Sequence, residues 1–260
     1  MCGYKGRFIQ TAGEGRWYVV HNTFLVLLYY PRPGLTLTNI FPLIDDIRQD
    51  AVMQQVFSTM NVFLRDQKHQ SQGDRKLRLL TYSCIPLSPA AGVLEWVENT
   101  IPLAGYLLHS KGAHTRYYPG EWSTGLCHMH MNGSPTHELR PSYDEVCKNF
   151  SPAFRFFFLE KFSHSPQLWH KARMSYTRSC AVNSMVGHIL GIGDRHSNNI
   201  LIHEHTGEVV HIDFGFVFEQ GKVQSTPETV PFRLTRDIVD GMVRAAAFDT
   251  FKCSFSLQFI

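Results

Sequence analysis

Residues 193–199 of the chain have the sequence GDRHSNN, and residues 211–215 have the sequence HIDFG. Phosphoryl transfer needs a carboxylate beside the acceptor hydroxyl, oxygen ligands that hold a metal against the phosphates, and positive charge at the transferring group. In the protein-kinase template, the catalytic aspartate precedes a metal-binding asparagine by five positions, and a later Asp-Phe-Gly supplies a second ligand. Asp194, Asn199 and Asp213 have this order and spacing. The two segments therefore predict a phosphotransferase site.

Each polar side chain of these segments has an expected role. Asp194 is predicted to orient the acceptor hydroxyl and take its proton, and His196 to stabilise the transferring phosphoryl oxygens. Asn199 and Asp213 are predicted to hold the metal. An isolated Asp-Phe-Gly has little meaning, and an isolated Asp-Arg-His is often a surface ion pair. Their joint occurrence in the correct order favours the functional interpretation.

Helix and strand signals surround the two segments. The dipeptide Ser165-Pro166 is a strong helix start, and this helix is expected to end near Leu190, where glycines follow. Residues 199–203 and 209–212, joined by a Thr-Gly turn, are expected to form a hairpin. The metal-binding residues are thus predicted to lie at the two ends of a hairpin.

Upstream, one helix and two apolar stretches are predicted. Asp45 or Asp46 can cap a helix that ends near Leu64, because apolar residues recur there at three- and four-residue spacing. These apolar positions are Val52, Val56, Met60 and Phe63. Residues 77–87 indicate a strand, and residues 92–97 a second apolar stretch.

Two regions show no clear periodicity. Residues 1–44 mix glycines, aromatics and a Pro-Arg-Pro-Gly turn, and residues 111–140 are predicted to be a long irregular connection. The second region contains a Cys-His-Met-His cluster at residues 127–130, followed by His137. This spacing matches no closed zinc pattern, so we interpret these histidines as surface or packing residues.

The composition is that of a soluble globular protein. The 260 residues are 43% hydrophobic and carry 25 basic against 22 acidic side chains, which is too small an excess to indicate direct DNA binding. The six cysteines lie far apart without a Cys-x-x-Cys pair, which is typical of reduced thiols in an intracellular protein. The longest apolar run, residues 24–30, is too short to span a membrane.

The Asp-Arg-His order reverses the His-Arg-Asp of ordinary protein kinases. With the following His-Ile-Asp, it resembles the phosphatidylinositol 3-kinase-related protein kinases, and within them the ataxia-telangiectasia mutated (ATM) branch. The stretches that carry this resemblance are residues 45–57 (DDIRQDAVMQQVF), 92–96 (GVLEW), 181–213, 218–222 (FEQGK) and 227–242 (PETVPFRLTRDIVDGM).

The resemblance implies a bilobed α+β kinase fold with a mostly helical carboxy lobe and an incomplete, β-containing amino lobe. Residues 45–97 would form part of the amino lobe with the hinge, and residues 98–242 the carboxy lobe with the catalytic and activation loops. Residues 1–44 and 243–260 fall outside the resemblance. We interpret these two flanks as foreign to the kinase, arising from an incomplete gene model or aberrant splicing.

The resemblance also implies an ATP site in the amino lobe. Asp50 would pair with the phosphate-binding lysine, and the hinge would be formed by Leu94, Glu95, Trp96 and Val97. Adenine would bind the backbone of Glu95 and Val97 and pack on Trp96. Without the resemblance, Trp96 would be interpreted as an ordinary core residue.

The segment after Asp213 distinguishes a protein substrate from a lipid substrate. An inositide headgroup calls for several basic residues, and Lys222 is the only one between Phe214 and Pro231. A protein hydroxyl is therefore the expected acceptor, and a phosphoinositide kinase the weaker alternative. The activation-loop residues implied by the resemblance are Phe214, Gly215, Pro227, Glu228, Thr229, Pro231, Phe232 and Arg233.

One departure from the family weakens the expected activity. The phosphate-binding lysine should lie eight residues before Asp50, where this chain has Pro42 followed by Leu43. Proline carries no cation. The pair Gly13 and Gly15 is a weak substitute for a glycine-rich phosphate loop, since the third glycine of the pattern is missing. A catalytically inactive kinase fragment is therefore the alternative hypothesis.

Taken together, the resemblance implies an ATM-like serine/threonine protein kinase in DNA-damage signalling. It would transfer the γ-phosphate of ATP, with Mg²⁺ or Mn²⁺, to Ser or Thr followed by Gln in protein substrates. It would be located in the nucleus and the cytoplasm, form a homodimer in the full-length protein, and reach DNA only through partner complexes. No membrane association is expected.

Overall fold

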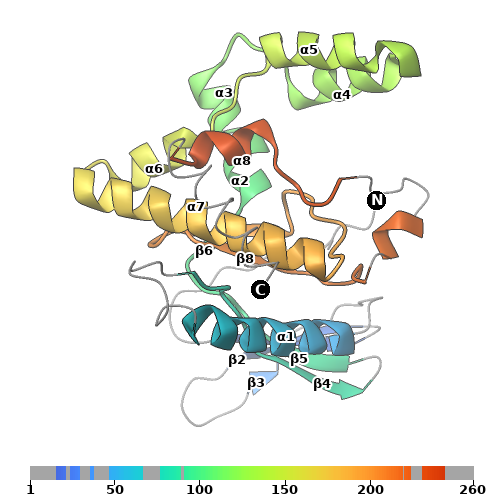
Figure 1. Ribbon diagram of the computed structural model, residues 1–260, viewed down its shortest axis with the longest axis vertical. Helices are drawn as coiled ribbons and strands as arrows, with labels where there is room; N and C mark the ends of the chain where they lie inside the picture. Colours follow the sequence, from blue (N-terminus) through green and yellow to red (C-terminus); the bar gives the residue numbers. More distant parts are fainter. Residues whose placement is uncertain are drawn as a thin grey trace. The chain divides into compact units, whose positions relative to one another are not determined.

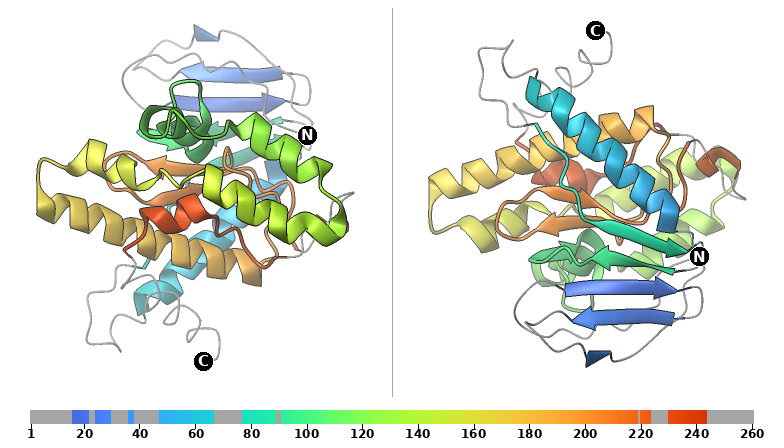
Figure 2. Two further views of the ribbon diagram at one scale, coloured as in Figure 1. Left: turned by 90° about the horizontal axis from the view of Figure 1, so that it is seen from above. Right: turned by 90° about the horizontal axis from the view of Figure 1, so that it is seen from below.

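The computed structural model describes residues 16–21, 24–29, 36–37, 47–66, 77–88, 91–218, 220–223 and 230–243. The chain forms two compact units, the first comprising residues 1–98 and 213–217 and the second residues 99–212 and 218–260. Figures 1 and 2 show their helices and strands. The fold is mixed, with helices predominating in the second unit, in agreement with the predicted α+β class.

The first unit contains a five-stranded antiparallel sheet in the order β3-β2-β1-β5-β4. Its strands are β1 (Arg16–His21), β2 (Phe24–Tyr29), β3 (Thr36–Leu37), β4 (Cys84–Ser88) and β5 (Ala91–Glu95). Three of them lie within residues 1–44, where the sequence predicted no regular element. Strand β2, with the sequence FLVLLY, is apolar at every position. It therefore lacks the alternation of apolar and polar residues by which a half-buried strand is predicted.

Helix α1 (Ile47–Asp66) confirms the predicted helix, but its buried face differs from the expected one. Met53 and Phe57 are almost fully buried, whereas Val52 and Phe63 are exposed. The predicted caps Asp45 and Asp46 lie outside the described residues.

Residues 77–82 are hydrogen-bonded to side chains of α1 before the chain enters the sheet. Asn61 on α1 donates to the Leu79 carbonyl and accepts from the Leu79 N–H, at 2.9 and 2.8 Å. The Gln54 side chain accepts from the Tyr82 N–H at 3.1 Å. The predicted strand over residues 77–87 was therefore wrong in its first half: polar side chains of the helix satisfy this backbone, and β4 begins only at Cys84.

The second unit combines helices with a three-stranded antiparallel sheet in the order β6-β7-β8. Its strands are β6 (Thr100–Pro102), β7 (Ile200–His203) and β8 (Val209–His211). Its helices are α2 (Leu103–Leu108), α3 (Ala113–Tyr117), α4 (Thr124–Gly133), η2 (Thr136–Glu138), α5 (Leu139–Asn149), α6 (Arg155–Phe162), α7 (Pro166–Ile189), η3 (Gln220–Val223) and α8 (Arg236–Gly241).

Helix α7 and the β7–β8 hairpin confirm their predictions. The Ser165 hydroxyl accepts from the Leu168 N–H at 3.4 Å and caps α7. Gly207 in the hairpin turn has a φ of 75°, and a Cβ there would lie 2.9 Å from the Ala172 carbonyl oxygen. Glycine is therefore required both by backbone conformation and by the close approach to α7.

The core of the second unit is aromatic. Phe154, Phe157 and Phe158 are fully buried, and Tyr176 of α7 packs against two of these rings, with centroids 5.2 and 5.3 Å away. Burial of each such side chain contributes roughly 1.5–3 kcal/mol. These rings join α6 to α7, and the Tyr176 hydroxyl donates to the Ile238 carbonyl of α8 at 3.0 Å.

Residues 111–140 form helices rather than the predicted irregular connection. The Ser123 hydroxyl caps α4 by accepting from the Leu126 N–H at 3.2 Å. Cys127 is the one buried residue of α4. A helix that buries so little has no apolar period to reveal it in the sequence.

Within the described part of the chain, no helix combines the length and the apolar character that a membrane span requires.

Candidate active site

The first half of the candidate site is the loop that follows α7 in the second unit, here called the DRH loop (residues 192–199). Asp194 has a φ of 53°, which is uncommon for a residue with a side chain. Its carbonyl accepts from the His196 N–H at 2.9 Å and from the Asn199 side-chain amide at 3.2 Å. The Asn199 N–H donates to the His196 carbonyl at 2.9 Å. The loop thus holds three predicted site residues in one tight turn.

Asp194 and His196 lie side by side in this turn. The Asn198 N–H donates to His196 Nδ1 at 3.2 Å, so the neutral imidazole carries its proton on Nε2. Nε2 is 4.0 Å from Asp194 Oδ2. Both side chains are about one-third exposed. A carboxylate that accepts a proton and an N–H that donates therefore point from one loop toward solvent, as a site that receives a substrate requires.

Asn199 is the buried member of the loop. It is 1% exposed, and its carbonyl accepts from the Ile212 N–H at 3.1 Å. On the other side, the Ser197 carbonyl accepts from the Ala104 N–H at 2.9 Å. The DRH loop is therefore fixed to α2 and to the end of β8 by backbone hydrogen bonds.

The second half of the candidate site is the Asp-Phe-Gly segment, residues 213–215, which belongs to the first unit. Phe214 is fully buried, and its ring packs edge-on against Phe57 of α1 with centroids 5.3 Å apart. The Gln49 side chain donates to the Phe214 carbonyl at 2.6 Å. The Asp213 carboxylate accepts from the Gly215 N–H at 3.4 Å. This segment is thus anchored by side chains of α1.

Asp50 is part of the same anchor. One of its carboxylate oxygens accepts from the Phe214 N–H and from the Tyr82 hydroxyl, both at 3.3 Å. Burial and then the Asp50 charge raise the pKa of the nearby Cys84 thiol to about 12. The resemblance assigned Asp50 only to the phosphate-binding lysine; the structure adds that it holds the Asp-Phe-Gly backbone.

The predicted hinge begins at the end of β5. The Glu95 N–H donates to the Ser83 carbonyl at 2.8 Å, and the Glu95 carboxylate accepts from the Ser83 N–H at 2.7 Å. An adenine bound at Glu95 would therefore have to use its carbonyl. Leu94, Trp96 and Val97 are half-buried, so Trp96 is not enclosed in a core.

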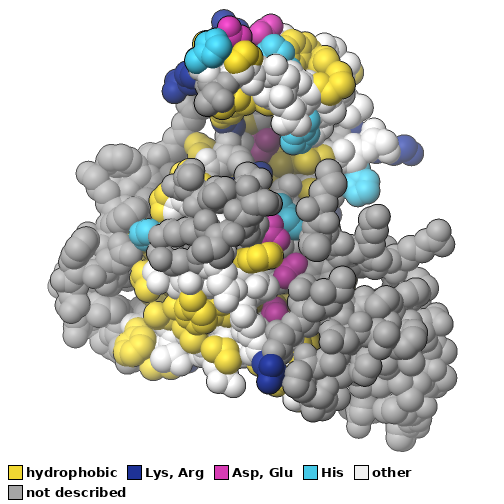
Figure 3. All heavy atoms as spheres, turned by 90° about the vertical axis from the view of Figure 1, so that its right-hand side faces the viewer, with side chains coloured by type: hydrophobic (Ala, Val, Ile, Leu, Met, Phe, Trp, Pro, Cys, Tyr) yellow, Lys and Arg dark blue, Asp and Glu magenta, His cyan; other side chains and the backbone are white. Residues whose placement is uncertain are grey.

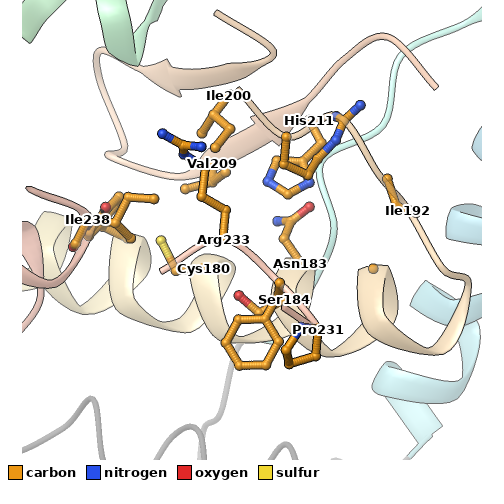
Figure 4. Close-up of a pocket in the computed structure, with 14 residues that line it drawn as sticks. Cys180, Asn183, Ser184, Ile192, Ile200, Val209, His211, Pro231, Arg233 and Ile238 are labelled. Carbon is orange, nitrogen blue, oxygen red and sulfur yellow. Dashed lines mark hydrogen bonds between the residues drawn. The ribbon is translucent and has the colours of Figure 1, made fainter. Parts of the chain in front are cut away.

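A small cavity of about 30 Å³ lies in the second unit, behind the DRH loop (Figure 4). Side chains of α7, β7 and β8 line it together with Pro231, Phe232 and Arg233, three of the predicted activation-loop residues. Burial and then the positive charge of Arg195 lower the pKa of His211 to about 3. His211, the histidine of the His-Ile-Asp segment, is therefore neutral at neutral pH and cannot act there as a general acid.

The sequence missed the supports of the site. The Asp-Phe-Gly segment is held by Gln49, Phe57 and Tyr82, the last acting through Asp50. Nothing in the local sequence of these residues indicates a contact with a segment 130 or more residues away. Two histidines of the Cys-His-Met-His region lie beside carboxylates: His130 of α4 is 3.2 Å from Glu145, and His137 of η2 is 3.4 Å from Glu138. In the described ranges, no group of three or more His, Cys, Asp or Glu could hold a metal ion.

Several predicted site positions lie outside the described residues. They are the expected lysine position with its neighbour, the glycine pair and part of the activation loop: Gly13, Gly15, Pro42, Leu43, Pro227, Glu228 and Thr229.

Comparisons with known proteins agree with the geometry. Residues 37–256 match the family model described as phosphatidylinositol 3- and 4-kinase, which extends past both ends of the stretch on which the resemblance was based. The chain is 53% identical over 201 residues to serine/threonine-protein kinase ATM of Arabidopsis thaliana, covering 76% of this chain and 5% of the relative. It is 46% identical over 219 residues to serine/threonine-protein kinase tel1 of Aspergillus oryzae, covering 82% of this chain and 7% of the relative.

A solved structure described as the complete CtTel1 dimer with C2 symmetry matches 90% of this chain and 9% of its own, with a TM-score of 0.78 and 39% identity. The chain thus spans less than a tenth of the length of these relatives. The matched part includes both the DRH loop and the Asp-Phe-Gly segment. The chain belongs to the phosphatidylinositol 3- and 4-kinase family, and its matched stretch is a kinase domain like those of ATM and Tel1.

Proposed function

We propose that the chain is a serine/threonine protein kinase domain that transfers the γ-phosphate of ATP to Ser or Thr followed by Gln. The observation that carries this proposal is the DRH loop, in which the Asp194 carboxylate and the His196 Nε2 lie 4.0 Å apart and Asn199 is buried. The ATM and tel1 relatives are named serine/threonine-protein kinases, which supports the reaction class.

Asp194 accepts the proton of the substrate hydroxyl as the hydroxyl oxygen forms a bond to the γ-phosphorus. The bond from that phosphorus to the bridging oxygen breaks, and ADP leaves with the electron pair. The His196 Nε2–H donates to a phosphoryl oxygen, where negative charge develops. The hydrogen bond from Asn198 to His196 Nδ1 keeps this proton on Nε2.

The donor chemistry suits a hard divalent cation. Asn199 offers an amide oxygen and Asp213 a carboxylate, and oxygen ligands are those that Mg²⁺ and Mn²⁺ prefer. The hydrogen bond from the Asn199 amide nitrogen to the Asp194 carbonyl leaves the amide oxygen as the ligand. The bound metal would neutralise phosphate charge.

Adenine is proposed to bind at residues 94–97. It would contact the Glu95 carbonyl and the Val97 backbone and pack on Trp96, while Asp50 supports the phosphate-binding part of the amino lobe through the Asp-Phe-Gly segment. Pro231, Phe232 and Arg233, with Gly215 at the other end, would border the protein substrate.

The wider role is proposed from the relatives. ATM and Tel1 kinases suggest DNA-damage signalling in the nucleus and cytoplasm, with protein substrates and with DNA reached through partner complexes. The CtTel1 dimer suggests a homodimer of the full-length protein.

The test is phosphorylation by the purified chain with ATP and Mg²⁺. A Ser-Gln peptide, the same peptide with Ala-Gln, and vesicles containing phosphatidylinositol are offered separately. We expect incorporation into the Ser-Gln peptide alone. Incorporation into lipid alone would favour a phosphoinositide kinase. No incorporation into any acceptor, with an ATP analogue failing to bind in Mg²⁺, would favour the inactive fragment that Pro42 suggests.

A further inference from the structure

The Arg195 side chain of the DRH loop joins two carbonyls that flank the proposed metal and catalytic residues. Its Nε donates to the Gly193 carbonyl at 2.9 Å, and its Nη1 donates to the Ile212 carbonyl at 2.7 Å. Gly193 directly precedes Asp194, and Ile212 directly precedes Asp213. One guanidinium therefore contacts the peptide unit before each of the two aspartates.

Both aspartates have backbone conformations that need such support. Asp194 has a φ of 53° and Asp213 a φ of 63°, and residues other than glycine rarely adopt this region. Conformations of this kind are strained and persist only where surrounding contacts hold them. A hydrogen bond to the carbonyl just before each aspartate fixes the orientation of the peptide plane that leads into this strained residue.

The burial of Arg195 indicates an interior role. The residue is 8% exposed and borders the small cavity behind the DRH loop. In Figure 4, His211 and Asn183 face this cavity from β8 and α7. A buried charge is costly unless hydrogen bonds satisfy it, so the two carbonyls stabilise the guanidinium as well as being fixed by it.

The geometry calls for arginine in particular. The planar guanidinium presents Nε and Nη1 at a fixed spacing, which lets one side chain donate to two carbonyls at once. Lysine has the same charge, but its three N–H donors all come from one nitrogen, so it lacks the fixed spacing of Nε and Nη1 that spans the two carbonyls.

From these contacts we propose that Arg195 is a positioning residue, which holds the Asp194 turn and the backbone entering Asp213 in the register that the reaction needs. This inference rests on the proposed kinase function for its catalytic consequence. Its structural consequence, a fixed pair of peptide units, does not depend on activity.

The experiment compares Arg195→Lys with the unaltered chain and with Arg116→Lys, a matched substitution at an exposed ion pair on α3. Steady-state kinetics with the Ser-Gln peptide give kcat, the KM for ATP and the Mg²⁺ concentration for half-maximal rate. Hydrogen exchange measures the Asn199 and Ile212 amides, which form the hydrogen bonds beside the bridge. Thermal unfolding and binding of an ATP analogue without metal report whether the variant is intact.

For Arg195→Lys we expect kcat to fall about tenfold or more and the half-saturating Mg²⁺ concentration to rise, as for other residues that support metal ligands. The KM for ATP should change little, the two amides should exchange about tenfold faster, and Arg116→Lys should match the unaltered chain. Unchanged kcat and exchange in Arg195→Lys would overturn the inference. So would a general loss of stability and of metal-free ATP-analogue binding with no selective effect at the two amides.

Two further results, an inactive unaltered chain and an unfolded variant, are distinguished from those above. If the unaltered chain phosphorylates nothing, the proposed function fails, and the exchange of the Asn199 and Ile212 amides alone decides for or against the bridge. If Arg195→Lys does not fold, Arg195→Gln takes its place, because it removes the buried charge along with the bridge. Faster exchange at the two amides in that variant would support the inference, and unchanged exchange would overturn it.

Discussion

The DRH loop and the Asp-Phe-Gly segment carry complementary parts of the proposed chemistry, yet they are held in different ways. The DRH loop is held by hydrogen bonds within residues 193–199, to Ile212 after β8 and to Ala104 of α2. The Asp-Phe-Gly segment is held by Gln49, Asp50 and Phe57, which precede it by more than 150 residues. Most contacts of the DRH loop thus join residues close in the sequence, and none of them involves α1, whereas the Asp-Phe-Gly segment depends on α1. Substitutions on α1 should therefore disturb one half of the site and leave the other intact.

The largest expected effect is on stability. Phe57→Ala removes a buried ring that packs on Phe214, and loss of such a side chain typically costs about 3–5 kcal/mol. Urea unfolding should show this loss in the first unit, whereas Phe63→Ala, at an exposed position of the same helix, should change stability by less than about 0.5 kcal/mol. Equal effects of the two substitutions would contradict the anchoring of Phe214 on α1.

A substitution in the DRH loop should affect catalysis without this loss of stability. His196→Ala removes the Nε2–H donor at the transferring phosphoryl group, and we expect kcat to fall by about 10²-fold. His205→Ala, in the exposed hairpin turn, is the control. The measurement is the initial rate with the Ser-Gln peptide at saturating ATP. A wild-type rate for His196→Ala would remove this residue from the proposed mechanism.

Gln49→Ala should have a smaller effect than Phe57→Ala. It leaves the Phe214 carbonyl without its side-chain donor, and an unsatisfied buried group of this kind costs about 1–3 kcal/mol. Because the same contact orients the Asp-Phe-Gly backbone, the Mg²⁺ requirement should rise while the Asn199 amide exchanges at its normal rate. Faster exchange at Asn199 in this variant would show that the two halves are not independently held.

The smallest expected effect is a pH dependence at alkaline pH. Burial raises the pKa of Cys180 from about 9 in the unfolded chain to about 12 in the folded one. The unfolded state therefore loses this proton first, so the contribution to stability is complete below pH 9 and falls by up to about 1.4 kcal/mol per pH unit above it. Comparing unfolding of the unaltered chain and Cys180→Ala at pH 8 and pH 10 measures this slope. A parallel decline in both would contradict it.

The sequence predicted the DRH loop, α7 and the hairpin because their signals are local. A capping serine before a proline, glycines after the helix and a turn glycine act within a few residues of their own position. For the same reason, the order and spacing of Asp194, Asn199 and Asp213 alone led to the prediction of a phosphotransferase site.

The parts that escaped prediction depend on tertiary contacts. The strands within residues 16–37 are recognisable only from their pairing with one another and, for β1, with β5. The polar anchors Asn61 and Gln54 turn residues 77–82 away from a strand conformation. The role of Asp50 in holding Phe214 required the fold, since no local pattern relates positions 164 residues apart.

The proposed kinase site depends on Asp194 as the proton acceptor. This role is tested by the kcat of Asp194→Asn against Asp144→Asn, a matched change at an exposed carboxylate on α5, with the Ser-Gln peptide as acceptor. We expect Asp194→Asn to lower kcat by about 10²–10⁴-fold while it still binds an ATP analogue, and Asp144→Asn to behave as the unaltered chain. A kcat for Asp194→Asn within twofold of the unaltered chain would show that Asp194 is not the proton acceptor.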